Sequence, residues 1–296
     1  MADDSRADTA TAQEVIGLWP DGPPTKGPDL NELSYLQPAA DGSQIRILRN
    51  VSEPTLTVYR PQGRANGVGV IVAPGGGWRI LAIEHEGTAL AEWLAARGYT
   101  AFLLKYRVAP TPPDPAEYAA AMAAVSTPLA TPRPASKAPR QIEEILRDDN
   151  TKFGRQLSVE DGRRALAIVR ERAGEWGVDA DRIGMIGFSA GAFLTIDVAL
   201  SGDGGLAFVA PIYGGGANGR PIPADAPPLF TCIANDDRML FRVVEGLYHD
   251  WCEADRPAEL HIFRRGGHGF GTVKQDAPAD GWMDLYAAWM ADLGFK

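Results

Sequence analysis

The sequence predicts an α/β fold, with a mostly parallel, doubly wound sheet and helices on both of its faces. Nearly continuous apolar runs, such as GVGVIVAP (67–74) and TAFLLKY (100–106), are typical of strands buried on both sides. Segments with helical spacing of their apolar residues lie between these runs. The regular alternation of the two kinds of segment favours parallel strands joined by crossover helices.

The chain has 296 residues, 45% of them hydrophobic, which is enough for one large core. We therefore expect a single domain over residues 1–296, with the Pro- and Gly-rich residues 1–40 wrapping its surface. Residues 109–150 interrupt the alternation with a Pro/Ala-rich insertion, in which short helices are predicted at 115–124 and 139–148. A lid over a site and a disordered surface insertion both fit this composition.

The first half of the chain opens with two short strand-like runs. Residues 45–51 and 55–61 are interpreted as antiparallel strands around a turn at 52–54. After the buried strand at 67–74, apolar residues at helical spacing predict a helix over 83–98.

The alternation of helices and strands resumes after the insertion. The predicted elements are a helix at 161–177, a strand at 182–188, a helix at 190–201, strands at 206–214 and 228–235, a helix at 239–253, a strand at 258–265 and a helix carrying Trp282, Leu285, Tyr286, Trp289 and Leu293. The last helix is expected to pack on the sheet.

Charge and hydropathy restrict the partners. A net charge of −9 argues against nucleic acid. No run reaches about 18 apolar residues, so no membrane span is expected. Residues 1–20 lack the basic start and apolar region of a signal peptide, which predicts a cytoplasmic location. A secreted or periplasmic protein that had lost its leader would have the same start. The oligomeric state is left open.

The most informative motif is GFSAG (187–191), which stands between an apolar strand and a helix. The glycines two residues before and after Ser189 leave room for a tight strand-to-helix turn. Such a turn lifts the hydroxyl above the sheet and directs the N–H of Ala190 to the same space, where a helix N-terminus favours a developing oxyanion. A purely structural glycine turn is the alternative.

A serine hydroxyl needs a base to become a nucleophile. Of the four histidines, His268 is the best candidate, because RRGGHGFG is a glycine-rich loop directly after a strand. His249 and His261 fall within a predicted helix and strand, and His85 follows the first glycine-rich loop. A surface position for His268 is the alternative.

The imidazole needs an acidic residue to orient it. Asp236 and Asp237 both follow the strand PLFTCIAN, at the edge of the sheet where sites form. We favour Asp237 and keep Asp236 as the alternative, with the other carboxylate capping the next helix. The order Ser189, Asp237, His268 is that of α/β hydrolases.

PGGGW (74–78) follows a buried strand, and its glycines let backbone N–H groups face a ligand. A phosphate-binding loop is disfavoured because neither nucleotide-binding glycine motif is present. Trp78 is expected to form a wall of the substrate pocket, with simple core packing as the alternative.

Together these stretches resemble α/β-hydrolase esterases of the acetylxylan-esterase-like, carbohydrate-acetylesterase-like branch. The matching stretches are NVSEPTLTVYRP, VIVAPGGGWRILAIEHEGTALAEWLAARGYTAFLLKYRVAP, RIGMIGFSAGAFLT and ELHIFRRGGHGFG. The resemblance implies the α/β-hydrolase fold and hydrolysis of a small-molecule ester through an acyl-enzyme, without metal or organic cofactor. It implies acetyl esters, including acetylated sugars or xylo-oligosaccharides, as substrates. By position it implies Ser189 as nucleophile, His268 as base, Asp237 as acid, and Gly76, Gly77 and Ala190 around the oxyanion.

Two departures from that branch concern the substrate. The chain has GFSAGAFLT where members often have GFSAGGHLA, and its insertion at 109–150 is longer than usual. A promiscuous short-chain carboxylesterase or lipase-like enzyme is therefore an alternative. A peptidase has little room for its usual extra domain, and a catalytically silent binding protein on a hydrolase fold is the alternative from another class.

Overall fold

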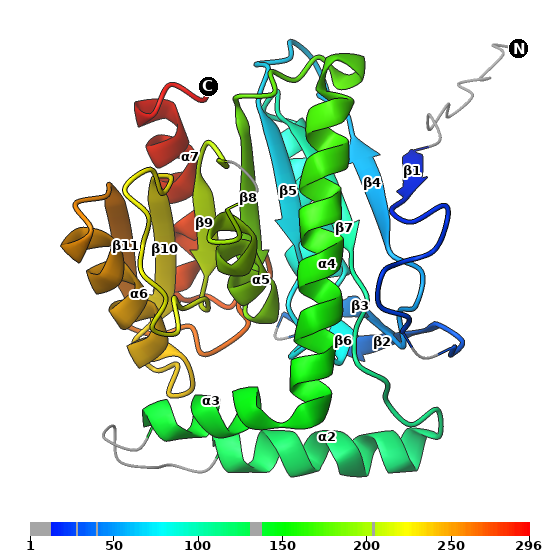
Figure 1. Cartoon of the computed structure of the whole chain (residues 1–296). Helices are drawn as coiled ribbons and strands as arrows, with labels where there is room; N and C mark the ends of the chain where they lie inside the picture. The colour runs from blue at the N-terminus through cyan, green and yellow to red at the C-terminus, as the bar shows by residue number, and fades with distance from the viewer. Residues whose placement is uncertain (1–12, 28, 40, 131–137, 203–204) are drawn as a thin grey trace, which may run out of the picture.

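The computed structural model describes residues 13–27, 29–39, 41–130, 138–202 and 205–296. Within these ranges an eight-stranded sheet forms the centre of the molecule (Figure 1). In spatial order its strands are β1 (Glu14–Gly17), β4 (Thr55–Tyr59), β7 (Thr100–Lys105), β5 (Gly69–Ala73), β8 (Ile183–Phe188), β9 (Val209–Ile212), β10 (Leu229–Ala234) and β11 (Ala258–Phe263). Within this eight-stranded sheet, as the structure describes it, only the β1–β4 and β4–β7 pairings are antiparallel, so the predicted mostly parallel sheet is confirmed.

Helices cover both faces of this sheet. The helices are π-helix η1 (Glu84–Thr88), α1 (Ala89–Ala95), α2 (Pro115–Ala130), α3 (Ala138–Arg147), α4 (Asp149–Glu171), 3-10 helix η3 (Ala173–Trp176), α5 (Ala190–Ala199), α6 (Phe241–Glu253), 3-10 helix η4 (Pro278–Gly281) and α7 (Trp282–Asp292). Figure 1 shows α4 and α5 in front of the sheet and α7 behind it. In the part of the chain that the structure describes, no helix combines the length and apolarity needed to cross a membrane.

The predicted pairing of 45–51 with 55–61 is wrong. β3 (Gln44–Arg49) instead pairs with β2 (Leu33–Pro38) and β6 (Ile80–Leu81) in a second, smaller sheet, whereas β4 lies between β1 and β7. Directly after β3, Asn50 adopts a φ of 56° and turns the chain. Its side-chain oxygen accepts hydrogen bonds from the N–H and hydroxyl of Thr111, both at 2.8 Å, which fixes the bend.

The N-terminal segment is held by strands and by a buried ion pair. β1 forms an edge of the main sheet, and β2 belongs to the smaller one. Between them, Trp19 Nε1 donates to Asp161 Oδ1 at 2.7 Å. Asp161 is fully buried and also accepts from Arg107 Nε at 3.0 Å. Of the predicted surface-wrapping segment 1–40, residues 1–12, 28 and 40 lie outside the described residues.

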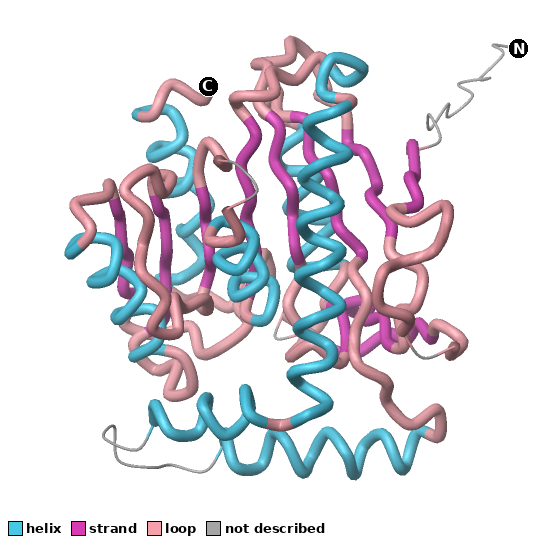
Figure 2. The backbone as a smooth tube through the Cα atoms, in the orientation of Figure 1, coloured by secondary structure: helices cyan, strands magenta, loops and turns pink. Residues whose placement is uncertain are grey.

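The insertion at 109–150 contains α2 and α3, which lie across the end of the sheet beneath α4 (Figure 2). α4 begins twelve residues before the helix predicted at 161–177, at Asp149 rather than residue 161. Much of its buried face consists of small or polar residues, including Gly154, Ser158 and Gly162. A Cβ on Gly154 would lie 2.6 Å from Trp78 O, so the helix needs glycine there to pack closely. Such a face carries little apolar periodicity, which explains the late prediction.

Candidate active site

Ser189 occupies the tight turn between β8 and α5 that the sequence predicts. Its backbone has φ 49° and ψ −112°, a conformation that non-glycine residues rarely adopt. A Cβ on Gly187 would lie 2.1 Å from Gly191 O, and one on Gly191 would lie 2.1 Å from Ala73 O. Both glycines are therefore required by close backbone contacts around this turn.

The structure brings Ser189, His268 and Asp237 into one chain of hydrogen bonds. Ser189 Oγ lies 2.9 Å from His268 Nε2, and His268 Nδ1 lies 2.7 Å from Asp237 Oδ2. The three residues come from the loops after β8, β11 and β10. The Asp237 side chain is fully buried, and its second oxygen accepts from the N–H groups of Met239 and Leu240 at 3.0 Å. One carboxylate thus orients the imidazole and holds the turn leading into α6.

Asp236, the alternative acid, has a different environment. Its Oδ1 accepts hydrogen bonds from the N–H groups of Gly266 and Gly267, at 3.1 and 2.9 Å. The expectation that the second carboxylate would cap the next helix is wrong, because α6 starts after Leu240 without a side-chain cap and Asp236 bonds these two glycines instead. Asp236 instead secures the loop that carries His268.

The residues expected around the oxyanion line the same cavity as the nucleophile. This cavity has a volume of ≈ 380 Å³, and its lining includes Gly76, Gly77, Ala190, Ser189 and His268. Backbone N–H groups at a helix N-terminus and in a glycine loop can stabilise a developing negative charge. The juxtaposition is the one that acyl transfer requires; the role of each group stays a prediction.

The glycine loop is held in one conformation by close contacts. Gly76 has a φ of 133°, and a Cβ on it would lie 2.2 Å from Ile80 O. Gly75 is not free to bind a substrate through its N–H, because that group donates to Glu86 Oε2 at 2.7 Å. Gly76 and Gly77 remain the candidates from this loop.

Apolar side chains form most of the cavity wall. Trp78 is both buried and part of this wall, and its ring packs on Phe193 with centroids 5.5 Å apart; its contact with a substrate stays a prediction. The insertion contributes Met122 from α2 and Ile142 and Ile145 from α3. The segment expected to be a lid or a surface insertion therefore covers part of the cavity.

Arg79 links the glycine loop to the insertion. It lines the cavity, and its guanidinium donates to Asp148 Oδ2 at 2.8 Å and to Thr151 Oγ1 at 2.9 Å. Asp148 is the residue between α3 and α4, and it caps α4 by accepting from the N–H of Thr151. The ion pair fixes the start of α4 beside the loop.

Two polar residues at the site, Glu86 and Tyr213, were not predicted from the sequence. Both are buried, and the Tyr213 hydroxyl donates to Glu86 Oε1 at 2.6 Å. Burial and the neighbouring Glu86 carboxylate raise the pKa of the Tyr213 hydroxyl well above its usual range. Tyr213 directly follows β9, and Glu86 lies close behind the glycine loop. Both residues follow central strands, Glu86 after β5 and the glycine loop and Tyr213 after β9. Polar residues in such positions are candidates for a site, and this signal could have identified them.

The remaining histidines lie elsewhere or face other groups. His261 Nε2 bonds Glu259 Oε1 at 2.6 Å on β11, and His249 lies on α6. His85 lines the cavity, but its Nε2 lies 3.8 Å from Glu86 Oε1. Over the described ranges, no three His, Cys, Asp or Glu side chains gather in a way that could hold a metal ion.

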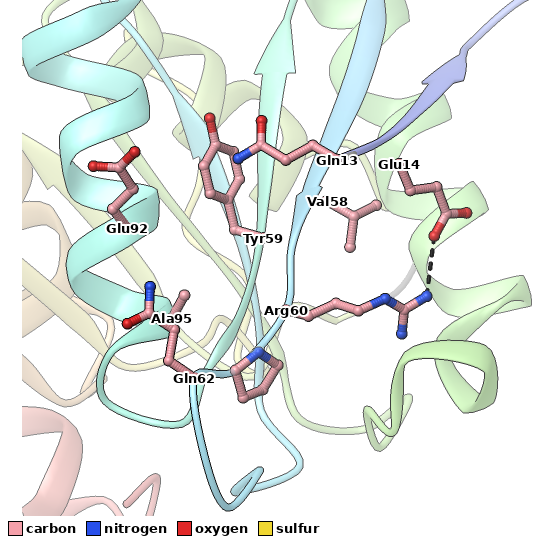
Figure 3. Close-up of a pocket in the computed structure, with 9 residues that line it drawn as sticks. Gln13, Glu14, Val58, Tyr59, Arg60, Gln62, Glu92 and Ala95 are labelled. Atoms are coloured by element: carbon pink, nitrogen blue, oxygen red, sulfur yellow. Dashed lines mark hydrogen bonds and ion pairs between the residues drawn. The ribbon is translucent and has the colours of Figure 1, made fainter. Parts of the chain in front are cut away.

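A larger cavity of ≈ 700 Å³ lies beside β1, β4 and α1, and it has a different character (Figure 3). Its lining contains neither serine nor histidine, and two of its three charged residues, Glu14 and Arg60, pair with each other at 3.1 Å. It shares no lining residue with the Ser189 cavity. Size alone therefore does not identify the site; the arrangement of reactive groups does.

Comparison with known proteins relates the chain to hydrolases. Over 269 residues it is 23% identical to an acetylxylan esterase from Xylanibacter ruminicola. This match covers 79% of the chain and 45% of that protein, so the chain spans less than half of this relative's length.

Two solved structures illustrate the shared fold. An acetyl ester-xyloside bifunctional hydrolase from Caldicellulosiruptor lactoaceticus has a TM-score of 0.63 and 20% identity, covering 95% of this chain and 97% of its own. A propionate-bound esterase 2 from Thermogutta terrifontis has a TM-score of 0.58 and 17% identity, covering 87% and 97%.

The sequence motifs indicated a resemblance to α/β-hydrolase esterases. The similar solved structures and the strand order of the main sheet agree with it. A family model covers most of the chain, from residue 57 to residue 290. The chain belongs to the dienelactone hydrolase family and has the α/β-hydrolase fold.

Proposed function

We propose that the protein is a serine ester hydrolase that works through an acyl-enzyme. The observation that carries this proposal is the continuous chain from Ser189 Oγ to His268 Nε2 at 2.9 Å and from His268 Nδ1 to Asp237 Oδ2 at 2.7 Å. Its membership of a hydrolase family supports the same reaction class.

In this mechanism, His268 Nε2 accepts the proton of Ser189 Oγ while the oxygen attacks the ester carbonyl. Asp237 keeps the second imidazole proton on Nδ1 and stabilises the imidazolium that forms. The N–H groups of Gly76, Gly77 and Ala190 donate hydrogen bonds to the tetrahedral oxyanion and stabilise its negative charge. The alcohol leaves with the proton from His268, and water then attacks the acyl-enzyme in the same way.

For the substrate, we propose short acyl esters, with acetyl as the first choice and acetylated sugars or xylo-oligosaccharides as the natural form. The names of two similar proteins, an acetylxylan esterase and an acetyl ester-xyloside hydrolase, support this choice. An acetyl group needs little space, and the polar side chains of Gln37 and Arg79 line the cavity for hydroxyl groups of the alcohol.

A second candidate is a short-chain carboxylesterase that binds an apolar acyl or alcohol group. The apolar wall contributed by Met122, Ile142 and Ile145 favours it, because a sugar would leave this surface without an apolar partner. The two candidates share the reaction and differ in whether the hydroxyl groups of a sugar or an apolar group of the ester provide the binding energy.

The test compares wild type, Ser189→Ala and the control Ser43→Ala on p-nitrophenyl acetate, butyrate and octanoate and on acetylated xylo-oligosaccharides. Ser43 lies in an exposed turn beside Asp41 and should be neutral. We expect Ser189→Ala to lose several orders of magnitude in kcat while remaining folded. Full activity of this variant refutes the nucleophile, and inactivity of the wild type on every ester favours a silent binding protein. The preferred ester separates the two substrate candidates.

A further inference from the structure

Glu86 is a buried carboxylate that the reaction itself does not use. It lies in the π-helical turn η1 and is 3% exposed. In the described part of the chain no lysine or arginine forms an ion pair with Glu86, and the imidazole of His85 lies nearby, with its Nε2 3.8 Å from Glu86 Oε1. Removing a carboxylate from water is costly unless hydrogen bonds replace the hydration. The partners of its two oxygens therefore indicate why the group is there.

Those partners connect the glycine loop with the loop that carries His268. Glu86 Oε2 accepts from Gly75 N–H at 2.7 Å, in the glycine loop. Glu86 Oε1 accepts from the Tyr213 hydroxyl at 2.6 Å, and that hydroxyl accepts from Gly271 N–H at 3.0 Å, in the loop of His268. We call this series of hydrogen bonds, Gly75–Glu86–Tyr213–Gly271, the Glu86 chain.

Packing around the Glu86 chain leaves little freedom. A Cβ on Gly75 would lie 2.7 Å from Glu86 Oε2 and 3.0 Å from Ser189 Cβ, so the carboxylate and the serine crowd the same space. The Tyr213 ring also contacts the His268 ring edge to face, with centroids 5.3 Å apart. Tyr213 therefore touches the imidazole through its ring and the loop behind it through its hydroxyl.

We propose that Glu86 and Tyr213 are positioning residues, which hold the glycine loop and the His268 loop in a fixed position relative to each other. This inference rests on the proposed serine-esterase function. The nucleophile reacts only when base and oxyanion donors are placed together, and a displacement of about 1 Å can cost about 10²-fold in rate. Because the Glu86 chain spans both loops, breaking it at either residue releases both.

The test uses two substitutions that keep side-chain volume. Glu86→Gln retains one oxygen acceptor, so an NH₂ group must face either the Gly75 N–H or the Tyr213 hydroxyl. Tyr213→Phe keeps the ring contact with His268 and removes the link between the loops. With p-nitrophenyl acetate we expect kcat to fall by about 10²-fold for Glu86→Gln and about 10-fold for Tyr213→Phe, with KM within about threefold.

The double variant tests coupling. If both residues act through one chain, the double variant loses no more kcat than Glu86→Gln alone, because the chain is already broken. Multiplicative losses would show that the two residues act separately and would overturn the inference. Should Glu86→Gln fail to fold, kcat and KM of Tyr213→Phe decide: an unchanged kcat, or a change in KM alone, also overturns it.

Asp161→Asn is the matched control for a general loss of stability. Asp161 is an equally buried carboxylate, bonded to Arg107 and Trp19, and it does not line the cavity. We expect this variant to lower Tm and leave kcat of the folded protein unchanged. If Glu86→Gln also lowers Tm and leaves kcat unchanged, the positioning role is refuted. The proposed function still stands in that case, provided that Ser189→Ala is inactive. Activity of Ser189→Ala would instead refute the proposed function itself.

Discussion

Asp237→Asn separates the two tasks of one carboxylate. Oδ1 of Asp237 accepts from Met239 and Leu240 N–H, and Oδ2 faces His268 Nδ1. An asparagine can keep its oxygen on the two N–H groups, which leaves its NH₂ toward the imidazole. A donor there requires an unprotonated Nδ1. Nε2 then carries the proton and faces Ser189 Oγ, 2.9 Å away, as a donor instead of a base.

The expected loss of activity is large because the substitution disfavours the tautomer of His268 in which Nε2 can act as a base. The same substitution in a Ser–His–Asp arrangement lowers kcat by about 10⁴-fold, which corresponds to about 5.4 kcal/mol in the activation free energy. The stability loss should be much smaller, about 1–2 kcal/mol, since the N–H partners keep an acceptor and lose only its charge. A loss of activity without unfolding is therefore the expected signature.

The assay measures kcat and KM on p-nitrophenyl acetate together with Tm, for Asp237→Asn and Asp236→Asn in parallel. Asp236 accepts from Gly266 and Gly267 through one oxygen, which an amide oxygen replaces. We expect less than a tenfold loss for Asp236→Asn. If Asp237→Asn kept a tenth of the activity, or if Asp236→Asn lost as much as Asp237→Asn, the proposed role of Asp237 would be refuted.

Two further outcomes are expected. Gly76→Ala places a Cβ 2.2 Å from Ile80 O at a φ of 133°, so Tm should fall and kcat drop by about 10²-fold or more. Ile145→Asn should raise KM for butyrate about fivefold and for acetate less than twofold; equal changes would exclude acyl contact with α3.

The central sheet could be predicted because its strands are buried on both faces. β5, β8 and β10 have no exposed residue, so each appears in the sequence as an unbroken apolar run. The pairing of β3 was not accessible in the same way, because a short half-buried strand carries no information on its partner. The helix predicted over 83–98 covers both η1 and α1, but the π-helical form of the first turn was not predicted.

Adjacent carboxylates show where sequence reasoning on the site ends. Asp236 and Asp237 follow the same strand, and both accept two backbone hydrogen bonds in the folded protein. Only the turn after β10, closed by Asp237 N–H on Ala234 O at 3.0 Å, decides which of them faces His268. Glu86 and Tyr213 leave even less trace, because a residue that positions others needs no motif of its own.

The two buried carboxylates of the site share a feature that bears on stability. In each carboxylate the two oxygens accept hydrogen bonds from different parts of the chain. Asp237 connects His268 to the residues before α6, and Glu86 connects Gly75 to Tyr213. Substitutions there should lower activity and Tm together. Ser189 Oγ bonds only His268 among the described residues, and its backbone is already strained at φ 49°. Ser189→Ala should therefore abolish activity without lowering Tm, and a fall in Tm comparable to that of Glu86→Gln would contradict this division between reacting and positioning groups.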